Sequence, residues 1–190
     1  ALAEGYLEIG DLERAEAEAA RAIEARRTPA TRAAHARTLL ARYAATAAAL
    51  TDVPPDQRAE RLADARKTLL EPAQELIRPL AGTAEEPAEA LARLAIIERR
   101  FEEAEDRIVD LEPDYPQDYT PELLRGLLEM ARGEAALKSA DRERAAETYR
   151  RAQSRFEAVT EIGRSDPRPR QLACRAARGV LRATMDRGGP

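Results

Sequence analysis

The sequence predicts an all-α fold built from antiparallel helical hairpins. Three observations lead to this prediction. Ala, Leu, Glu and Arg are strong helix formers and dominate the chain, whereas aromatic residues make up only 4% and Trp is absent. Apolar residues recur at spacings of three and four, as on one face of a helix. Tight turns separate these apolar runs. We therefore expect about four hairpins and one further helix within a single domain of residues 1–190.

The first hairpin is predicted over residues 1–27. Gly10 can adopt the left-handed conformation that ends a helix, and Asp11 can cap the helix that follows. The predicted apolar face of the first helix consists of Leu2, Tyr6 and Ile9. Thr28-Pro29 then ends the second helix and opens another.

A second, less regular hairpin is predicted over residues 29–80. Its first helix includes residues 36–50, and TDVPPDQ (51–57) forms a loop because of its prolines. Pro72 lies inside the long second helix and lacks a backbone donor. We therefore expect a kink or a break there.

Two further hairpins are predicted over residues 86–112 and 121–162. The first of these turns near Arg99-Arg100, and the second has Asp141 as a helix cap. The second helix of three hairpins carries a small residue near its start, which allows two helices to approach closely. These residues are Ala15, Ala104 and Ala145.

An extra helix is predicted over residues 167–187, with two adjacent apolar stripes. One stripe consists of Leu172, Ala176 and Val180, and the other of Ala177, Leu181 and Met185. Seven arginines and two aspartates lie between Gly163 and Pro190, a net charge of +5, so the rest of this −4 chain carries −9. We interpret the arginines as a solvated face, because no aromatic residues alternate with them as in many nucleic-acid-binding surfaces.

These hairpins resemble the tetratricopeptide repeat, a 34-residue helix–turn–helix unit. The resemblance rests on three segments, which are LAEGYLEIGDLERAEAEAARAI, RRFEEAEDRIVDLEP and ADRERAAETYRRA. No unit has the family's Trp, and insertions at TDVPPDQ and EPDYPQDYTP lengthen the spacing. The resemblance implies a right-handed superhelical α-solenoid. The alternative is an irregular α-bundle, whereas the proline breaks disfavour a coiled coil.

The resemblance also implies a concave groove that holds a peptide or a helix of another protein. In this family, the first helix of each pair lines the groove. Positions off the packing stripes of these helices are therefore the candidate binding residues. They are Glu4, Leu7, Glu8, Arg37, Ala41, Glu89, Arg93, Ile96, Glu134 and Lys138. Of these, Leu7 and Ile96 are expected to be exposed apolar contacts.

Residues that carry chemistry are sparse. His35 is the only histidine, and we expect it to be a partly exposed helix residue. Cys174 is the only cysteine, and we expect it to be a small buried side chain. No Gly-rich phosphate loop or apolar run long enough for a membrane span occurs. We therefore expect no catalytic residue, cofactor or metal, and no nucleic-acid or membrane partner.

The favoured function is a non-catalytic scaffold that binds a protein or peptide. One alternative is an assembly element that stacks through its terminal helices, with self-association as one form. A further alternative is an enzyme on an all-α frame. The chain begins inside a predicted helix, so we expect it to be part of a longer protein, and no compartment is indicated.

Overall fold

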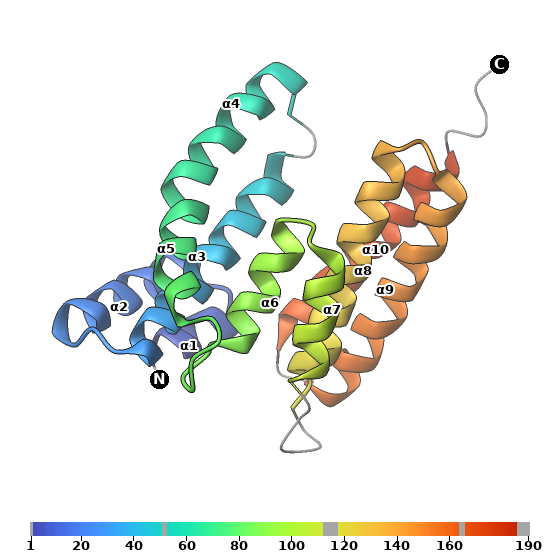
Figure 1. Ribbon diagram of the computed structural model, residues 1–190. Helices are drawn as coiled ribbons and strands as arrows, with labels where there is room; N and C mark the ends of the chain where they lie inside the picture. The colour runs from blue at the N-terminus through green and yellow to red at the C-terminus, as the bar shows by residue number, and fades with distance from the viewer. Residues whose placement is uncertain (1, 51–52, 112–117, 164–165, 186–190) are drawn as a thin grey trace. The chain divides into compact units, whose positions relative to one another are not determined.

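The computed structural model describes residues 2–50, 53–111, 118–163 and 166–185. No strand occurs among these residues, so the all-α prediction is confirmed. The α-helices, labelled in Figure 1, are α1 (Leu2–Glu8), α2 (Leu12–Ala25), α3 (Pro29–Ala49), α4 (Pro55–Ala65), α5 (Glu71–Ile77), α6 (Ala88–Ile97), α7 (Phe101–Val109), α8 (Thr120–Lys138), α9 (Arg142–Ile162) and α10 (Pro167–Met185).

The chain divides into two compact units, Ala1–Leu94 and Ala95–Pro190. In the first unit, α1 packs on α2, α2 packs on α3, and α3 packs on α5. The predicted single domain is not tested by this division, and the predicted solenoid stays a prediction as well. Of the predicted loop TDVPPDQ, residues 51–52 lie outside the described residues, and residues 55–57 instead form the first turn of α4, which proline tolerates. Residues 112–117 of the other predicted loop also lie outside the described residues.

Pro72 lies inside a helical segment and does not end it. A π-helical turn, Arg66–Leu70, joins α4 to α5 directly before the proline. Within this turn the Glu71 N–H bonds the carbonyl of Arg66, five residues back. The wider turn accommodates a residue that has no N–H and whose ring would collide with a carbonyl of an ordinary α-helix. The expected break does not occur, because α4, the π turn and α5 follow one another without interruption.

Three hairpin turns share one backbone pattern. The turn residue has a positive φ, which is 79° at Gly10, 62° at Arg99 and 61° at Ala140. The next residue donates its N–H to the carbonyl five residues back, at 2.9 Å in all three turns. Asp11 and Asp141 then accept from the third residue of the helices that they cap. The predicted turns are confirmed.

The small residues that follow these turns pack as the sequence predicts. Ala15, Ala104 and Ala145 are each 0% exposed. Each of these residues also donates its N–H to the carbonyl of the residue directly after the turn residue, at 2.9–3.0 Å. The start of each second helix is therefore fixed by one backbone bond and one closely packed methyl group.

In the second unit, α9 packs between α8 and α10. Gly133 of α8 and Gly179 of α10 both contact the Tyr149 ring of α9. Gly126 lies seven residues before Gly133 and contacts Phe156, seven residues after Tyr149. This reversed order shows that α8 and α9 are antiparallel. The glycines leave room for the two rings, which are almost completely buried.

Three expectations about burial are wrong. Leu2 and Ile9 are 68% exposed, because α1 buries Ala3 instead of the predicted face. Cys174 is exposed, because α10 turns Ala173 and Ala176 toward the core and each step along a helix rotates the next side chain away. In the second stripe of α10, Leu181 and Met185 are also exposed.

We predict that Gly179→Ala destabilises the second unit by about 1–3 kcal/mol. The added Cβ would lie 2.5 Å from Cδ1 of Tyr149, whose buried ring has little room to move. Chemical denaturation measures the loss. Tyr149→Leu in the Gly179→Ala background should recover part of the lost stability.

Gly5→Ala is the control of opposite sign. The added methyl group meets no atom within 4 Å and should stabilise α1 by about 0.5–1 kcal/mol. Equal effects of the two Gly→Ala changes would contradict this packing.

Candidate protein-binding site

Four of the predicted binding residues come together in the first unit. Arg37 of α3 donates from Nη1 to Oε2 of Glu89 at 3.0 Å and from Nη2 to Oε1 of Glu4 at 2.5 Å. Arg93 donates from Nε to the second oxygen of Glu89 at 2.9 Å. These residues form one connected row, Glu4–Arg37–Glu89–Arg93, which we call the charged row. It links α1, α3 and α6.

The charged row is partly shielded from water, and its charges hold one another ionised. Burial works to raise the pKa of Glu89, but Arg93 and Arg37 outweigh it and bring the pKa below its ordinary value. The same balance lowers the pKa of Glu4, with Arg37 as the favourable partner. Burial works to lower the pKa of Arg37, yet pairing with Glu89 and Glu4 raises it. Glu4, Arg37 and Glu89 therefore stay charged throughout the neutral pH range.

Two arginines of the row retain unused donors. The Nε atom of Arg37 is buried and has no hydrogen-bond partner among the described residues. Arg93 uses only Nε in its bond to Glu89, and its terminal nitrogens make no hydrogen bond within the described part of the chain. The Arg93 side chain is partly exposed. Its guanidinium can therefore donate two parallel hydrogen bonds to a further carboxylate, in the planar bidentate geometry that arginine favours.

The other predicted binding residues are distributed over both units. Leu7 of α1 and Ala41 of α3 are half-buried in the first unit, and the side chain of Glu8 lies outside the described part. Ile96 is only 8% exposed, so the expectation of an exposed apolar contact there is wrong. Glu134 and Lys138 are exposed on α8 in the second unit.

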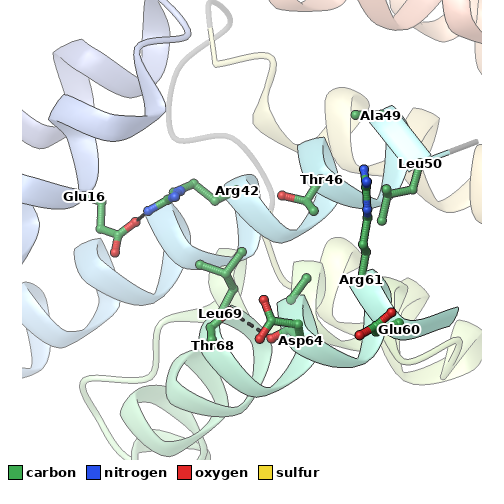
Figure 2. Close-up of a pocket in the computed structure, with 11 residues that line it drawn as sticks. Glu16, Arg42, Thr46, Ala49, Leu50, Glu60, Arg61, Asp64, Thr68 and Leu69 are labelled. Carbon is green, nitrogen blue, oxygen red and sulfur yellow. Dashed lines mark hydrogen bonds and ion pairs between the residues drawn. The ribbon is translucent and has the colours of Figure 1, made fainter. Parts of the chain in front are cut away.

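The first unit also contains an open cleft of about 820 Å³ between α3 and α4, with Glu16 of α2 at one side. Figure 2 shows Arg42 pointing toward Glu16, with which it forms an ion pair, and Arg61 reaching toward Leu50 and Ala49. Thr68 donates to the carbonyl of Asp64 at 2.9 Å. The lining contains neither histidine nor cysteine. The cleft can offer charges and hydroxyls to a ligand.

This cleft could not be predicted from the sequence. Its charged residues occupy helix positions whose sequence pattern is that of any solvent-exposed helix face. The cleft depends on how far α4 stands from α3, which the pattern of residues does not encode. TDVPPDQ was the only local signal, because a loop at that point allows the two helices to separate.

Neither a metal centre nor a membrane span emerges from the described residues. They contain no group of three or more His, Cys, Asp or Glu side chains placed to hold a metal ion. None of the helices in the described ranges is long and apolar enough to cross a membrane. Comparison with known proteins finds no matching family model, no matching curated protein and no matching solved structure. The tetratricopeptide resemblance therefore stays a prediction from the sequence.

We predict that stability falls as the pH drops below about 6.5 because of His35. Its Nδ1 is buried on α3 without a partner among the described residues, and burial lowers its pKa below the ordinary 6.5. The unfolded chain takes up a proton at the ordinary pKa, whereas the folded chain resists it. The contribution is thus complete above this pH and is lost as the pH falls toward the lowered value.

Denaturation between about pH 7.5 and 5.5 measures this effect, in a window where few other side chains titrate. His35 is the only histidine, so His35→Gln should flatten the dependence of stability on pH. An unchanged slope in that variant would show that another group is responsible.

We also predict that Arg37 and Glu89 are energetically coupled. Arg37→Met leaves two carboxylates without their shared partner, and Glu89→Met leaves Arg37 without one of its two. Each single variant should therefore lose about 1–3 kcal/mol of unfolding free energy. The double variant should cost less than the sum, with a coupling of about 0.5–3 kcal/mol. The pair Arg21 and Glu18, in which the arginine is exposed, is the control, with an expected coupling below about 1 kcal/mol. Equal couplings for the two pairs would show that the row adds nothing beyond a surface ion pair.

Proposed function

We propose that this protein is a non-catalytic interaction module that binds a peptide or helix of another protein along α1, α3 and α6. The observation that carries the proposal is the charged row. Four residues chosen from the sequence as binding candidates form a single connected set on three helices. These helices are the first members of successive predicted hairpins.

The charged row favours a ligand that carries an acidic residue. Arg93 has terminal donors that are not used within the described residues, whereas both oxygens of Glu89 are already bonded. An incoming carboxylate would meet Arg93 without breaking an existing bond. Half-buried Leu7 lies on α1 with Glu4 and offers an apolar contact. We therefore expect the ligand to combine an Asp or Glu with a neighbouring apolar side chain.

Binding is favoured over catalysis on chemical grounds. A general base or nucleophile works when its pKa is tuned and a reacting group can reach it. The cleft between α3 and α4 is lined without histidine or cysteine, and the lowered pKa of Glu89 makes it a weaker base than an ordinary carboxylate. These features suit recognition of a charged partner.

We predict that a displayed library of random peptides, selected on the 190-residue chain, yields sequences with an acidic residue beside an apolar one. Arg93→Gln should weaken the selected peptides by about tenfold or more in fluorescence anisotropy, since a charged hydrogen-bonded contact is lost. Arg61→Gln is the matched control, because it removes one exposed cation from the cleft in the same unit.

The result decides between the two surfaces of the first unit. Peptides that ignore Arg93→Gln but lose affinity with Arg61→Gln would place the binding site in the cleft. A selection that yields no specific peptide would count against peptide recognition by this chain.

A further inference from the structure

The outer face of α10 combines exposed apolar and basic side chains. Leu181 is 55% exposed and Met185 is 75% exposed, one helical turn apart. Arg178 and Arg182 are exposed and lie within one turn of Leu181. The opposite side of α10 buries small residues, so this outer face is the side turned away from α9.

The charge on α10 is of one sign. The helix contains five arginines and no acidic residue. Arg168 pairs with Asp166 just before the helix. The other four arginines form no ion pair within the described residues, and they are Arg170, Arg175, Arg178 and Arg182. A docking partner would therefore need an excess of acidic groups around an apolar contact.

The α1–α2 hairpin of this same chain has the complementary character. Leu2 and Ile9 are exposed on one side of α1, seven positions apart. Gly5 lies between them on that side, and a methyl group added to it would meet no atom within 4 Å. The segment from Leu2 to Ala25 carries seven acidic residues and two arginines, a net charge of −5. Two arginines of α3, Arg37 and Arg42, pair with Glu4 and Glu16 of this segment, and an excess of acidic groups remains. The α1 backbone at Gly5 is therefore open to close approach between two apolar side chains, within an acidic hairpin.

We propose that the outer face of α10 in one copy docks on the Leu2–Gly5–Ile9 face of α1 in a second copy. Leu181 and Met185 cover Leu2 and Ile9, and the absence of a side chain at Gly5 lets the helices approach closely. The arginines of α10 face the acidic α1–α2 hairpin, which gives the contact its orientation. The apolar docking residues Leu2, Gly5 and Ile9 lie outside the charged row, although Glu4 of that row belongs to the acidic α1–α2 hairpin, and the docking does not require peptide binding.

The composition of the face favours a protein over a nucleic acid. A phosphate-binding surface needs cations that follow the backbone, and single strands also need aromatic rings for stacking. On α10, exposed leucine and methionine lie among the arginines, and the helix has no aromatic residue. Pairing of α10 with α10 of another copy would bring arginines together. Docking of α10 on the acidic α1–α2 hairpin avoids that repulsion between arginines.

The contact joins two different faces, so each copy retains one free α1 face and one free α10 face. Successive copies can therefore add to either side. The seven-residue helix α1 offers less surface than a standard interface buries, and the association is weak and concentration-dependent. Sedimentation velocity of the 190-residue chain should show an average mass that rises with concentration up to about 1 mM.

Two blocked variants test the orientation. Leu181→Glu with Met185→Glu blocks the α10 face, and Leu2→Glu with Ile9→Glu blocks the α1 face. Each variant alone should be monomeric, because it has only one of the two faces. An equimolar mixture should form a one-to-one dimer and nothing larger. All four positions are solvent-exposed, and circular dichroism will verify that both variants keep their helices.

Charge reversal provides the second test. Arg178→Glu with Arg182→Glu should weaken association by about tenfold or more. Arg144→Glu with Arg150→Glu changes the net charge equally on exposed positions of α9 and should leave association unchanged. A monomeric wild type at the highest concentration would overturn the proposal. Self-association of the variant blocked at α1 would overturn it too, as would binding of duplex or single-stranded DNA that Leu181→Glu does not affect.

Discussion

Close approach of helices at small side chains is the constraint on which this structure depends. With few aromatic residues, the chain cannot fill wide spaces between helices, so its helices must lie near one another. Alanine provides that approach just after three hairpin turns. In the second unit, Gly133 of α8 and Gly179 of α10 also allow close approach, because they leave the space that the Tyr149 ring fills. Burial also raises the pKa of that tyrosine to about 12, so its hydroxyl stays neutral at any ordinary pH.

The charged row depends on the same constraint. Three helices must lie close enough for side chains from α1, α3 and α6 to meet, and arginine can then bridge two carboxylates at once. Under the proposed function, each ion pair of the row also determines which charges remain available to a ligand. The close approach of these helices explains why the candidate site lies on regular helices and needs no long loop.

Local features of the fold could be predicted from the sequence, because they depend on a few neighbouring residues. The Gly10-Asp11 turn, the Thr28-Pro29 boundary and the cap at Asp141 follow from backbone preferences and short hydrogen bonds. Burial was harder to predict, because it depends on what packs against each helix. Periodicity placed Leu2 and Ile9 on one face correctly, but Ala3 is the residue that contacts the neighbouring helices.

The candidate site shows the same division. Choosing positions off the packing stripes selected Glu4, Arg37, Glu89 and Arg93 as candidates, and the structure connects them because charged residues on a helix are rarely buried without partners. That Arg37 bridges two carboxylates could not be predicted, because the bridge depends on distances between helices. Ile96 was misjudged for the related reason that an apolar residue beside a predicted stripe can still be enclosed.

The π turn before Pro72 has a consequence for the helix that continues past the proline. A π turn holds one residue more than an α turn, which shifts the helical phase of α4 relative to α5. Ala65 and Leu69 before the proline and Ala73 and Ile77 after it are all buried, so the extra residue leaves these apolar side chains enclosed. A single missing amide hydrogen is thus accommodated within one turn, and the helical segment that contacts α3 continues beyond it.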